Sequence, residues 1–211
     1  NLRFSGVGTQ KIEDELTSLF PDAKILRMDA DTTSQRTSHE ALLDSVAAGE
    51  AGILVGTQMV AKGLDFPNVT LVGVLDADLS LYCGDYHAQE RTFSLLTQVV
   101  GRAGRRNKPG RAVIQTFTPE NPIILAAAAQ DYDTFYVHEI QSREALQAPP
   151  FSDLTVFTLS SVNEKEGMLA AQRVAVTLKQ FFAGEFSDLS ADVWGPVPAA
   201  ISRLNKRYRF T

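Results

Sequence analysis

The sequence predicts an α/β fold built on a parallel sheet, followed by a small α+β unit. Apolar segments of strand length alternate with segments of helical periodicity in the first part of the chain. Strands that are apolar on both faces and alternate with helices are typical of a parallel sheet covered on both sides. This pattern breaks at the segment APPF, residues 148–151, after which a new strand and helix begin.

The first unit is expected to span residues 1–147 and to begin with a helix. Ile12, Leu16 and Leu19 fall at helical spacing within residues 11–20, and Pro21 ends that pattern. The other expected elements are strands at 23–28, 51–55, 69–75 and 111–117, helices at 39–49 and 86–100, and trailing helices within 122–147.

The second unit is expected to span residues 148–211. Its helix, 164–182, places apolar residues on one face, and Trp194 is expected to anchor a core beside a proline-rich turn. Its expected strands are 154–159, a short one near 192–194 and the basic segment 206–210. Since the chain begins with Asn1 and Thr211 falls where a strand should continue, we expect it to be a piece of a longer protein.

Composition and charge exclude several classes of protein. No apolar run approaches the roughly 18 residues of a membrane span, and no secretory signal opens the chain. Cys83 is the single cysteine, which excludes an internal disulfide and favours a reducing, cytoplasmic setting. The net charge of −5 argues against a uniformly basic nucleic-acid binder. Cations nevertheless concentrate in residues 102–111 and 203–209, where phosphate-bearing partners are expected to dock.

Polar residues follow the predicted strands at the points where each strand ends. In a parallel sheet, ligands gather outside the carboxyl ends of the strands. Asp76 and Asp78 could contact a ligand or an arginine there, although paired acids after a strand also serve as helix caps. The segments at these strand ends are Asp29-Ala30-Asp31, Gly56-Thr57-Gln58, Asp76-Ala77-Asp78 and Thr116.

The stretch QVVGRAGRR, residues 98–106, combines two glycines and three arginines at a predicted helix end. A guanidinium group stays charged, and its planar fork binds two oxygens of a phosphoryl group. An arginine supplied from a neighbouring domain stabilises the charge of a phosphoryl-transfer transition state. The alternative is a solvated basic helix end that complements the helix dipole.

The segment GTQMVAKGLDF, residues 56–66, carries a second chemical signal after its strand. Thr57 and Gln58 could donate hydrogen bonds to the phosphates of a nucleic-acid strand. Lys62 would add a phosphate-binding charge, and Asp65 could accept from a ribose hydroxyl or orient an arginine. The alternative is an ordinary polar loop between a strand and a helix.

Together the two segments resemble motifs V and VI of the second RecA-like lobe of superfamily 2 helicases. The particular residues of these motifs narrow the resemblance to the primosomal protein N-prime family, the replication-restart DNA helicases. The residues that carry it are GTQMVAKGLDFPNVTLVGVLDAD, LLTQVVGRAGR, the Pro149-Pro150-Phe151 junction and VWGPVPAAI with RYRF. This resemblance covers essentially the whole chain.

The resemblance implies an ATP-driven 3′-to-5′ DNA helicase that begins primosome assembly at stalled or branched forks. Arg102 and Arg105 would be the paired arginines of motif VI, of which at least one acts as an arginine finger on ATP, with Gln98 on the nucleotide side. The second unit would be part of a DNA-binding domain similar to ribosomal protein S10. The residues implied to couple DNA to nucleotide are Gly63 and Asp65, and those implied to bind DNA are Thr57, Gln58, Lys62, Arg203, Lys206, Arg207 and Arg209.

The chain is expected to hold half of an ATPase. It contains no G-x-x-x-x-G-K-[ST] loop. We therefore expect ATP and Mg²⁺ to be bound mainly by another lobe, no metal site in this chain, and no turnover by the chain alone. The resemblance implies zinc only in the full-length family, and primosome and single-strand-binding proteins as partners. Two alternatives remain: another superfamily 2 translocase of the branch-migration type, and a RecA-like lobe that binds without catalysis.

Overall fold

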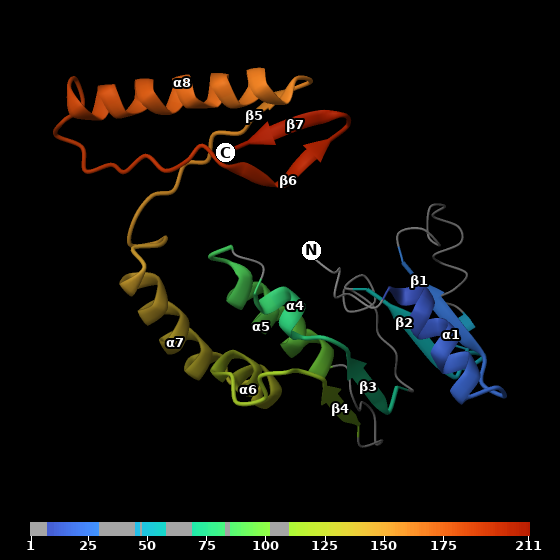
Figure 1. Cartoon of the computed structure of the whole chain (residues 1–211). Helices are drawn as coiled ribbons and strands as arrows, with labels where there is room; N and C mark the ends of the chain where they lie inside the picture. The colour runs from blue at the N-terminus through green and yellow to red at the C-terminus, as the bar shows by residue number, and fades with distance from the viewer. Residues whose placement is uncertain (1–7, 30–44, 47, 58–68, 83–84, 102–109) are drawn as a thin grey trace. The chain divides into compact units, whose positions relative to one another are not determined.

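The computed structural model describes residues 8–29, 45–46, 48–57, 69–82, 85–101 and 110–211 (Figure 1). The chain divides into two compact units, Asn1–Phe151 and Ser152–Thr211. No helix among the described residues combines the length and the apolar composition that a bilayer-spanning segment needs.

One pair of parallel strands lies beside the first helix. β1 (Ile25–Met28) pairs with β2 (Ile53–Gly56), with Ile25 opposite Ile53. Helix α1 (Thr9–Leu19) packs against both strands. It ends before Pro21, as expected of a residue that cannot continue a helix. Most of the helix expected at 39–49 lies outside the described residues.

A second parallel pair is formed by β3 (Leu71–Val74) and β4 (Arg111–Ile114). A short helix, α4 (Asp78–Leu81), follows β3, and α5 (Ala88–Val100) follows α4. Helix α5 packs against both strands of the pair. It begins two residues later than the helix expected at 86–100 and ends at the same residue.

The α/β class is confirmed, but the expected single sheet is not. The described strands of the first unit form two separate parallel pairs. Side chains of β3 and β4 alternate between exposed and half-buried, and Leu71 is 62% exposed. Among the described residues, helix α5 packs against this pair, and the partly buried Val74 and Ile114 pack against the core that α5 helps to form.

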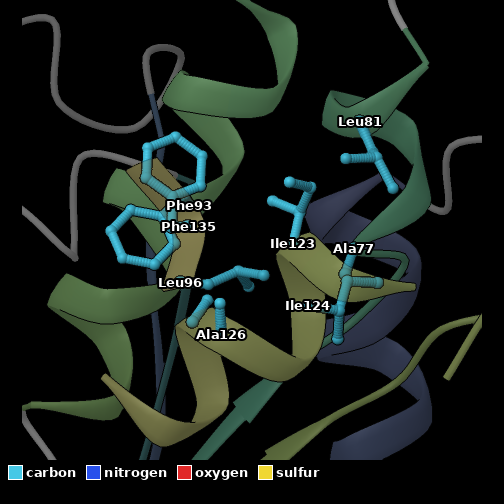
Figure 2. Close-up of a cluster of buried hydrophobic side chains, with 9 residues drawn as sticks. Ala77, Leu81, Phe93, Leu96, Ile123, Ile124, Ala126 and Phe135 are labelled. Atoms are coloured by element: carbon cyan, nitrogen blue, oxygen red, sulfur yellow. The ribbon is translucent and has the colours of Figure 1, made fainter. Parts of the chain in front are cut away.

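The main hydrophobic core lies where α5 meets two later helices, α6 (Pro122–Ala129) and α7 (Tyr132–Ala145) (Figure 2). The rings of Phe93 and Phe135 stack with their centroids 4.0 Å apart. This core fixes α5, which leads directly into the arginine stretch. Its buried members are Ala77, Leu81, Phe93, Leu96, Ile123, Ile124, Ala126, Ala127 and Phe135.

The segment 122–147, expected to be helical, forms two helices. Helix α6 begins at an Asn121 cap, whose side chain accepts a hydrogen bond from the Ile123 N–H. Helix α6 ends at Ala129 because the next residue, Gln130, adopts a left-handed conformation with φ of 55°. Asp131 then caps α7 by accepting from the Thr134 N–H at 3.0 Å.

The second unit is a three-stranded antiparallel sheet with one helix. The strands are β5 (Leu159–Ser161), β6 (Pro198–Leu204) and β7 (Arg207–Phe210), in the order β5-β7-β6. Helix α8 (Glu164–Ala183) packs against β5 and β7. A Cβ atom at Gly167 would lie only 2.8 Å from the Phe210 ring, so this glycine permits the close packing of helix on sheet.

Three expectations for the second unit are wrong. Residues 154–158 and 192–194 form no strand, and β6 occupies a segment for which no strand was expected. Trp194 is 79% exposed rather than a core anchor. The buried aromatic of this unit is Phe210, which β7 presents to α8. Trp194 lies in a segment without regular secondary structure, so no strand presents it to α8.

Candidate functional site

Helix α5 positions the candidate nucleotide-facing residues. Gln98 lies exposed in its last turn, and its amide donates to the Ser94 hydroxyl at 3.1 Å. Gly101 ends the helix, with its N–H donating to the Thr97 carbonyl at 2.9 Å. Arg102 and Arg105 follow directly and lie outside the described residues.

Gly101 has a packing role that the sequence motif does not reveal. A Cβ atom there would lie 3.1 Å from the Gln130 amide nitrogen and 3.2 Å from the Thr97 carbonyl oxygen. The Gln130 amide also donates to the Thr97 carbonyl at 3.3 Å. The glycine thus allows the turn between α6 and α7 to approach the end of α5, just before the arginine stretch.

The candidate DNA contacts of the first unit follow β2. Thr57 is exposed immediately after the strand ends at Gly56. Its side chain is therefore accessible from solvent. The residues of this segment that lie outside the described residues are Gln58, Lys62, Gly63 and Asp65.

Asp78 has a structural role. Its carboxylate accepts hydrogen bonds from the Phe117 N–H at 2.8 Å and from the hydroxyls of Thr116 and Thr118 at 3.0 and 2.8 Å. Burial alone would raise the pKa of the Asp78 carboxyl, but these donors lower it below the ordinary aspartate value. Asp78 thereby ties the start of α4 to the segment that follows β4, and its oxygens are already occupied.

A polar cluster that was not expected from the sequence lies where β1 ends. The Thr9 hydroxyl donates to the buried Asp29 carboxylate at 2.6 Å, and Arg27 Nε lies 3.3 Å from the same oxygen. Arg27 also pairs with Glu13 at 3.4 Å and contacts Gln10. These contacts fix the first turn of α1 against the carboxyl end of β1. Only the position of Asp29 after an apolar strand could have indicated the cluster.

The candidate DNA contacts of the second unit lie on the β6–β7 hairpin. Asn205 and Lys206 form its two-residue turn with φ of 50° and 63°, as a tight hairpin requires. Since Phe210 faces α8 and side chains alternate along a strand, Arg207 and Arg209 face away from the helix. The hairpin therefore presents cations both at its tip and on the sheet face opposite α8.

The contacts of these cations leave their charges available. The Arg203 guanidinium lies 5.0 Å from the centroid of the Tyr208 ring, and Arg207 donates to the Ser160 carbonyl at 3.2 Å. Among the described residues, no carboxylate forms an ion pair with Arg203, Lys206, Arg207 or Arg209. Arg203 also covers one face of Tyr208, which leaves less of this ring for base stacking.

Two of the three histidines, His87 and His138, lie among the described residues. His87 Nδ1 lies 3.2 Å from a Glu90 oxygen, and His138 lies on α7. No group of three or more His, Cys, Asp or Glu side chains is arranged as metal ligands within the described ranges. His39 and Cys83 lie outside them.

Comparison with known proteins identifies first the class and then the family. Residues 7–107 match the helicase conserved C-terminal domain, which confirms the expected helicase lobe. Residues 144–211 match the primosomal protein N C-terminal domain. The chain belongs to the replication restart protein PriA family.

Three relatives show how much of the family's sequence this chain represents. Replication restart protein PriA of Bacillus subtilis is 46% identical over 212 residues, covering 100% of this chain and 26% of the relative. The Synechocystis protein of that name is 44% identical over 99% of this chain and 24% of the relative. The Treponema pallidum protein is 38% identical over 98% and 31%. The chain spans about a quarter to a third of the length of these relatives.

Proposed function

We propose that this chain forms the second motor lobe and part of the DNA-binding C-terminal domain of an ATP-dependent 3′-to-5′ DNA helicase that acts in replication restart. The observation that carries the proposal is the match of the whole chain to replication restart proteins, with a helicase domain before a primosomal protein N domain. The second match favours this function over that of a branch-migration translocase. In this proposal the longer enzyme loads the primosome at stalled or branched forks.

The arginines after α5 supply the catalytic contribution of this chain. When bound, ATP supplies the γ-phosphoryl group whose transfer to water drives movement. Arg102 and Arg105 stabilise the negative charge that develops during this transfer, as arginine fingers do. The described residues fit a contributing role, because Gln98 is exposed at the end of α5 while the phosphate-binding loop is absent from the sequence. Another lobe would therefore hold most of the nucleotide and its Mg²⁺.

The segment after β2 supplies the contact with DNA in this lobe. Thr57 and Gln58 donate to backbone phosphates, and Lys62 adds a positive charge. Gly63 and Asp65 couple this contact to the nucleotide. The exposed position of Thr57 at the end of β2 supports this assignment.

The basic hairpin supplies a second contact with DNA. Arg203 and Lys206 lie near its tip, and Arg207 and Arg209 lie on the sheet face opposite α8. Backbone contacts of this kind bind without reading sequence, which suits a protein that recognises the shape of a fork.

Strand displacement by the full-length protein tests the proposal. We expect it to unwind a fork in the 3′-to-5′ direction with ATP and Mg²⁺ and to stall with a non-hydrolysable analogue. The 211-residue chain should bind the same DNA without DNA-stimulated ATP turnover. Unwinding in the opposite direction would contradict the assigned polarity, and DNA-stimulated turnover by the chain alone would contradict the division of the nucleotide site. DNA binding without turnover by the full-length protein would favour the non-catalytic alternative.

A further inference from the structure

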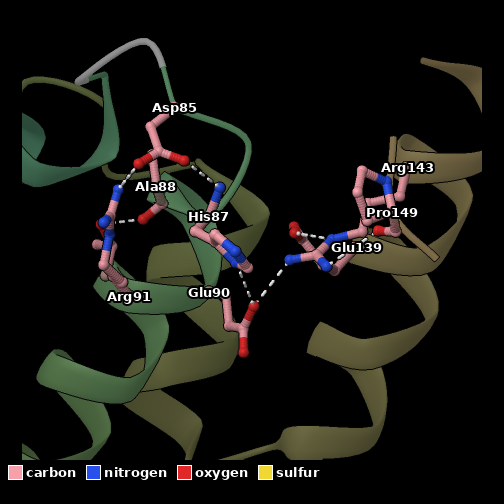
Figure 3. A network of polar contacts seen from close by, with 9 residues as sticks. Asp85, His87, Ala88, Glu90, Arg91, Glu139, Arg143 and Pro149 are labelled. Atoms are coloured by element: carbon pink, nitrogen blue, oxygen red, sulfur yellow. Dashed lines mark hydrogen bonds and ion pairs between the residues drawn. The ribbon is translucent and has the colours of Figure 1, made fainter. Parts of the chain in front are cut away.

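A network of polar contacts centres on Arg143, near the end of α7 (Figure 3). Its guanidinium donates to Glu139 at 2.8 Å, to Glu90 at 2.8 Å and to the Pro149 carbonyl at 3.2 Å. It also lies 5.4 Å from the centroid of the Tyr86 ring. The Arg143 side chain is only 14% exposed, so its ion pairs are largely shielded from solvent, unlike an ordinary surface ion pair. We call these five residues the Arg143 network.

The Arg143 network joins helix α5 to the turn that leaves α7. Glu90 lies in the first turn of α5, the helix that ends with Gln98 and leads into the arginine stretch. Pro149 lies in the turn that leaves α7, three residues before the second unit begins at Ser152. That turn is also held to α7 by its main chain, since the Ala148 N–H donates to the Arg143 carbonyl at 2.8 Å.

Helix α7 and the turn before it contact α5 at three points, in an order that makes the two helices antiparallel. At one end, Gln130 donates to the Thr97 carbonyl in the last turn of α5. In the middle, Phe135 stacks on Phe93. At the other end, Arg143 pairs with Glu90. Because a helix rises 1.5 Å per residue, Glu90 and Gln98 lie about 12 Å apart along one continuous rod.

We propose that Arg143 is a positioning residue that couples the junction before the second unit to the helix that carries the motif VI residues. The inference rests on the proposed function, because it takes the arginine stretch to be catalytic and the second unit to bind DNA. In this arrangement, DNA held by the second unit changes the position of the junction peptide. Arg143 passes that change to Glu90, and α5 passes it to the arginines that follow Gly101.

The chemistry of the network requires an arginine. The planar guanidinium offers donors in fixed directions to two carboxylates and one carbonyl, whereas lysine offers a single ammonium. Glu90 also lies beside His87, and the His87 ring together with Arg143 holds the pKa of the Glu90 carboxyl below its ordinary value. Glu90 therefore stays charged, and the connection between the two helices persists at neutral pH.

Two variants and one matched control test this inference in the full-length protein. Glu90→Gln removes a charge from a half-exposed side chain. Arg143→Lys keeps the positive charge but loses the planar guanidinium with its donors in fixed directions. The control is Arg91→Lys, because Arg91 lies on the same helix but pairs with Asp85 outside the network. We expect Glu90→Gln and Arg143→Lys to reduce the ratio of DNA-stimulated to basal kcat by about five- to tenfold. The KM for ATP and the Kd for DNA should stay near the wild-type values.

Hydrogen exchange on the 211-residue chain gives a readout that does not depend on catalysis. Arg143→Lys should speed exchange about fivefold or more both in the junction, at Ala148 and Phe151, and in the first turns of α5. The control should leave the junction unchanged. Faster exchange confined to the junction would overturn the inference, because Arg143 would then anchor the turn without acting on α5.

The kinetic results separate this inference from the proposed function. An unchanged stimulation ratio in both variants would overturn the coupling role, as would an equal loss of basal and stimulated turnover or an equal effect in the control. If the wild-type protein shows no DNA-stimulated turnover, the proposed function fails. The exchange experiment then still decides whether Arg143 links the junction to α5.

Discussion

At the residue scale, Asp78 shows that a polar side chain at a strand end can stabilise the fold instead of binding a ligand. Its position after a predicted strand made it a candidate for ligand contact, yet its carboxylate is already used by three donors that follow β4. These donors stabilise the charged form, which lowers the pKa of the carboxyl although burial opposes it. The stabilisation is therefore present above the unfolded pKa of about 3.9 and is lost as pH falls through the folded pKa.

Replacement of Asp78 by asparagine should reduce the free energy of unfolding by about 1–2 kcal/mol at pH 7. Urea denaturation of the chain at several pH values measures this difference. The gap between wild type and variant should narrow below about pH 4, as the wild-type carboxylate becomes protonated. Asp76→Asn is the matched control, and a similar loss there, or a gap that does not depend on pH, would contradict the role of Asp78.

A second residue-scale prediction concerns Gly167. Alanine normally stabilises a helix relative to glycine by about 1 kcal/mol. At this position the added Cβ would lie 2.8 Å from the buried Phe210 ring and 3.0 Å from Ser161 Cβ. We therefore expect Gly167→Ala to destabilise the second unit by about 1–3 kcal/mol, measured by chemical denaturation. Gly73→Ala meets no atom within 4 Å and serves as a control for steric cost. A stabilised Gly167→Ala variant would show that the packing of helix on sheet is looser than described.

At the element scale, the basic hairpin gives a prediction about DNA affinity. Arg207→Ala and Arg209→Ala should each reduce the slope of log Kd against log salt concentration by about one. Fluorescence anisotropy of the chain with a labelled fork measures this slope. Arg173 lies exposed on α8, on the other side of the sheet from Arg207 and Arg209, so Arg173→Ala is the matched control. Equal slopes in all three variants would remove the hairpin from the DNA interface.

Elements were predictable where periodicity and stop signals agreed. Apolar spacing identified α5 to within two residues of its start, and Pro21 fixed the end of α1. The position of the break between α6 and α7 could not be predicted, because a left-handed glutamine ends α6 where glycine is the usual signal. Apolar and β-branched residues in 154–158 and 192–194 predicted strands there, yet no strand of the described sheet pairs with either segment. Local pattern does not specify such long-range pairing.

At the scale of the whole molecule, some parts of the site could be located from the sequence and others could not. The residues of the two motifs located the segments after β2 and α5, and the match to the helicase domain confirmed the class of the lobe. The Arg143 network could not have been found in the sequence, because Glu90 and Arg143 are 53 residues apart and belong to no motif. It became visible only when packing brought α7 along α5.

The central claim is that the arginines after α5 act on nucleotide held by another lobe. Steady-state ATP turnover by the full-length protein with Arg105→Ala, in the presence of DNA, tests it most directly. We expect kcat to fall about 1,000-fold or more, because a catalytic arginine contributes that much to phosphoryl transfer. The Kd for DNA should stay near the wild-type value. Arg106→Ala, outside the motif pair, should retain most turnover. Near-normal turnover by Arg105→Ala, or an equal loss in the Arg106→Ala control, would contradict the account.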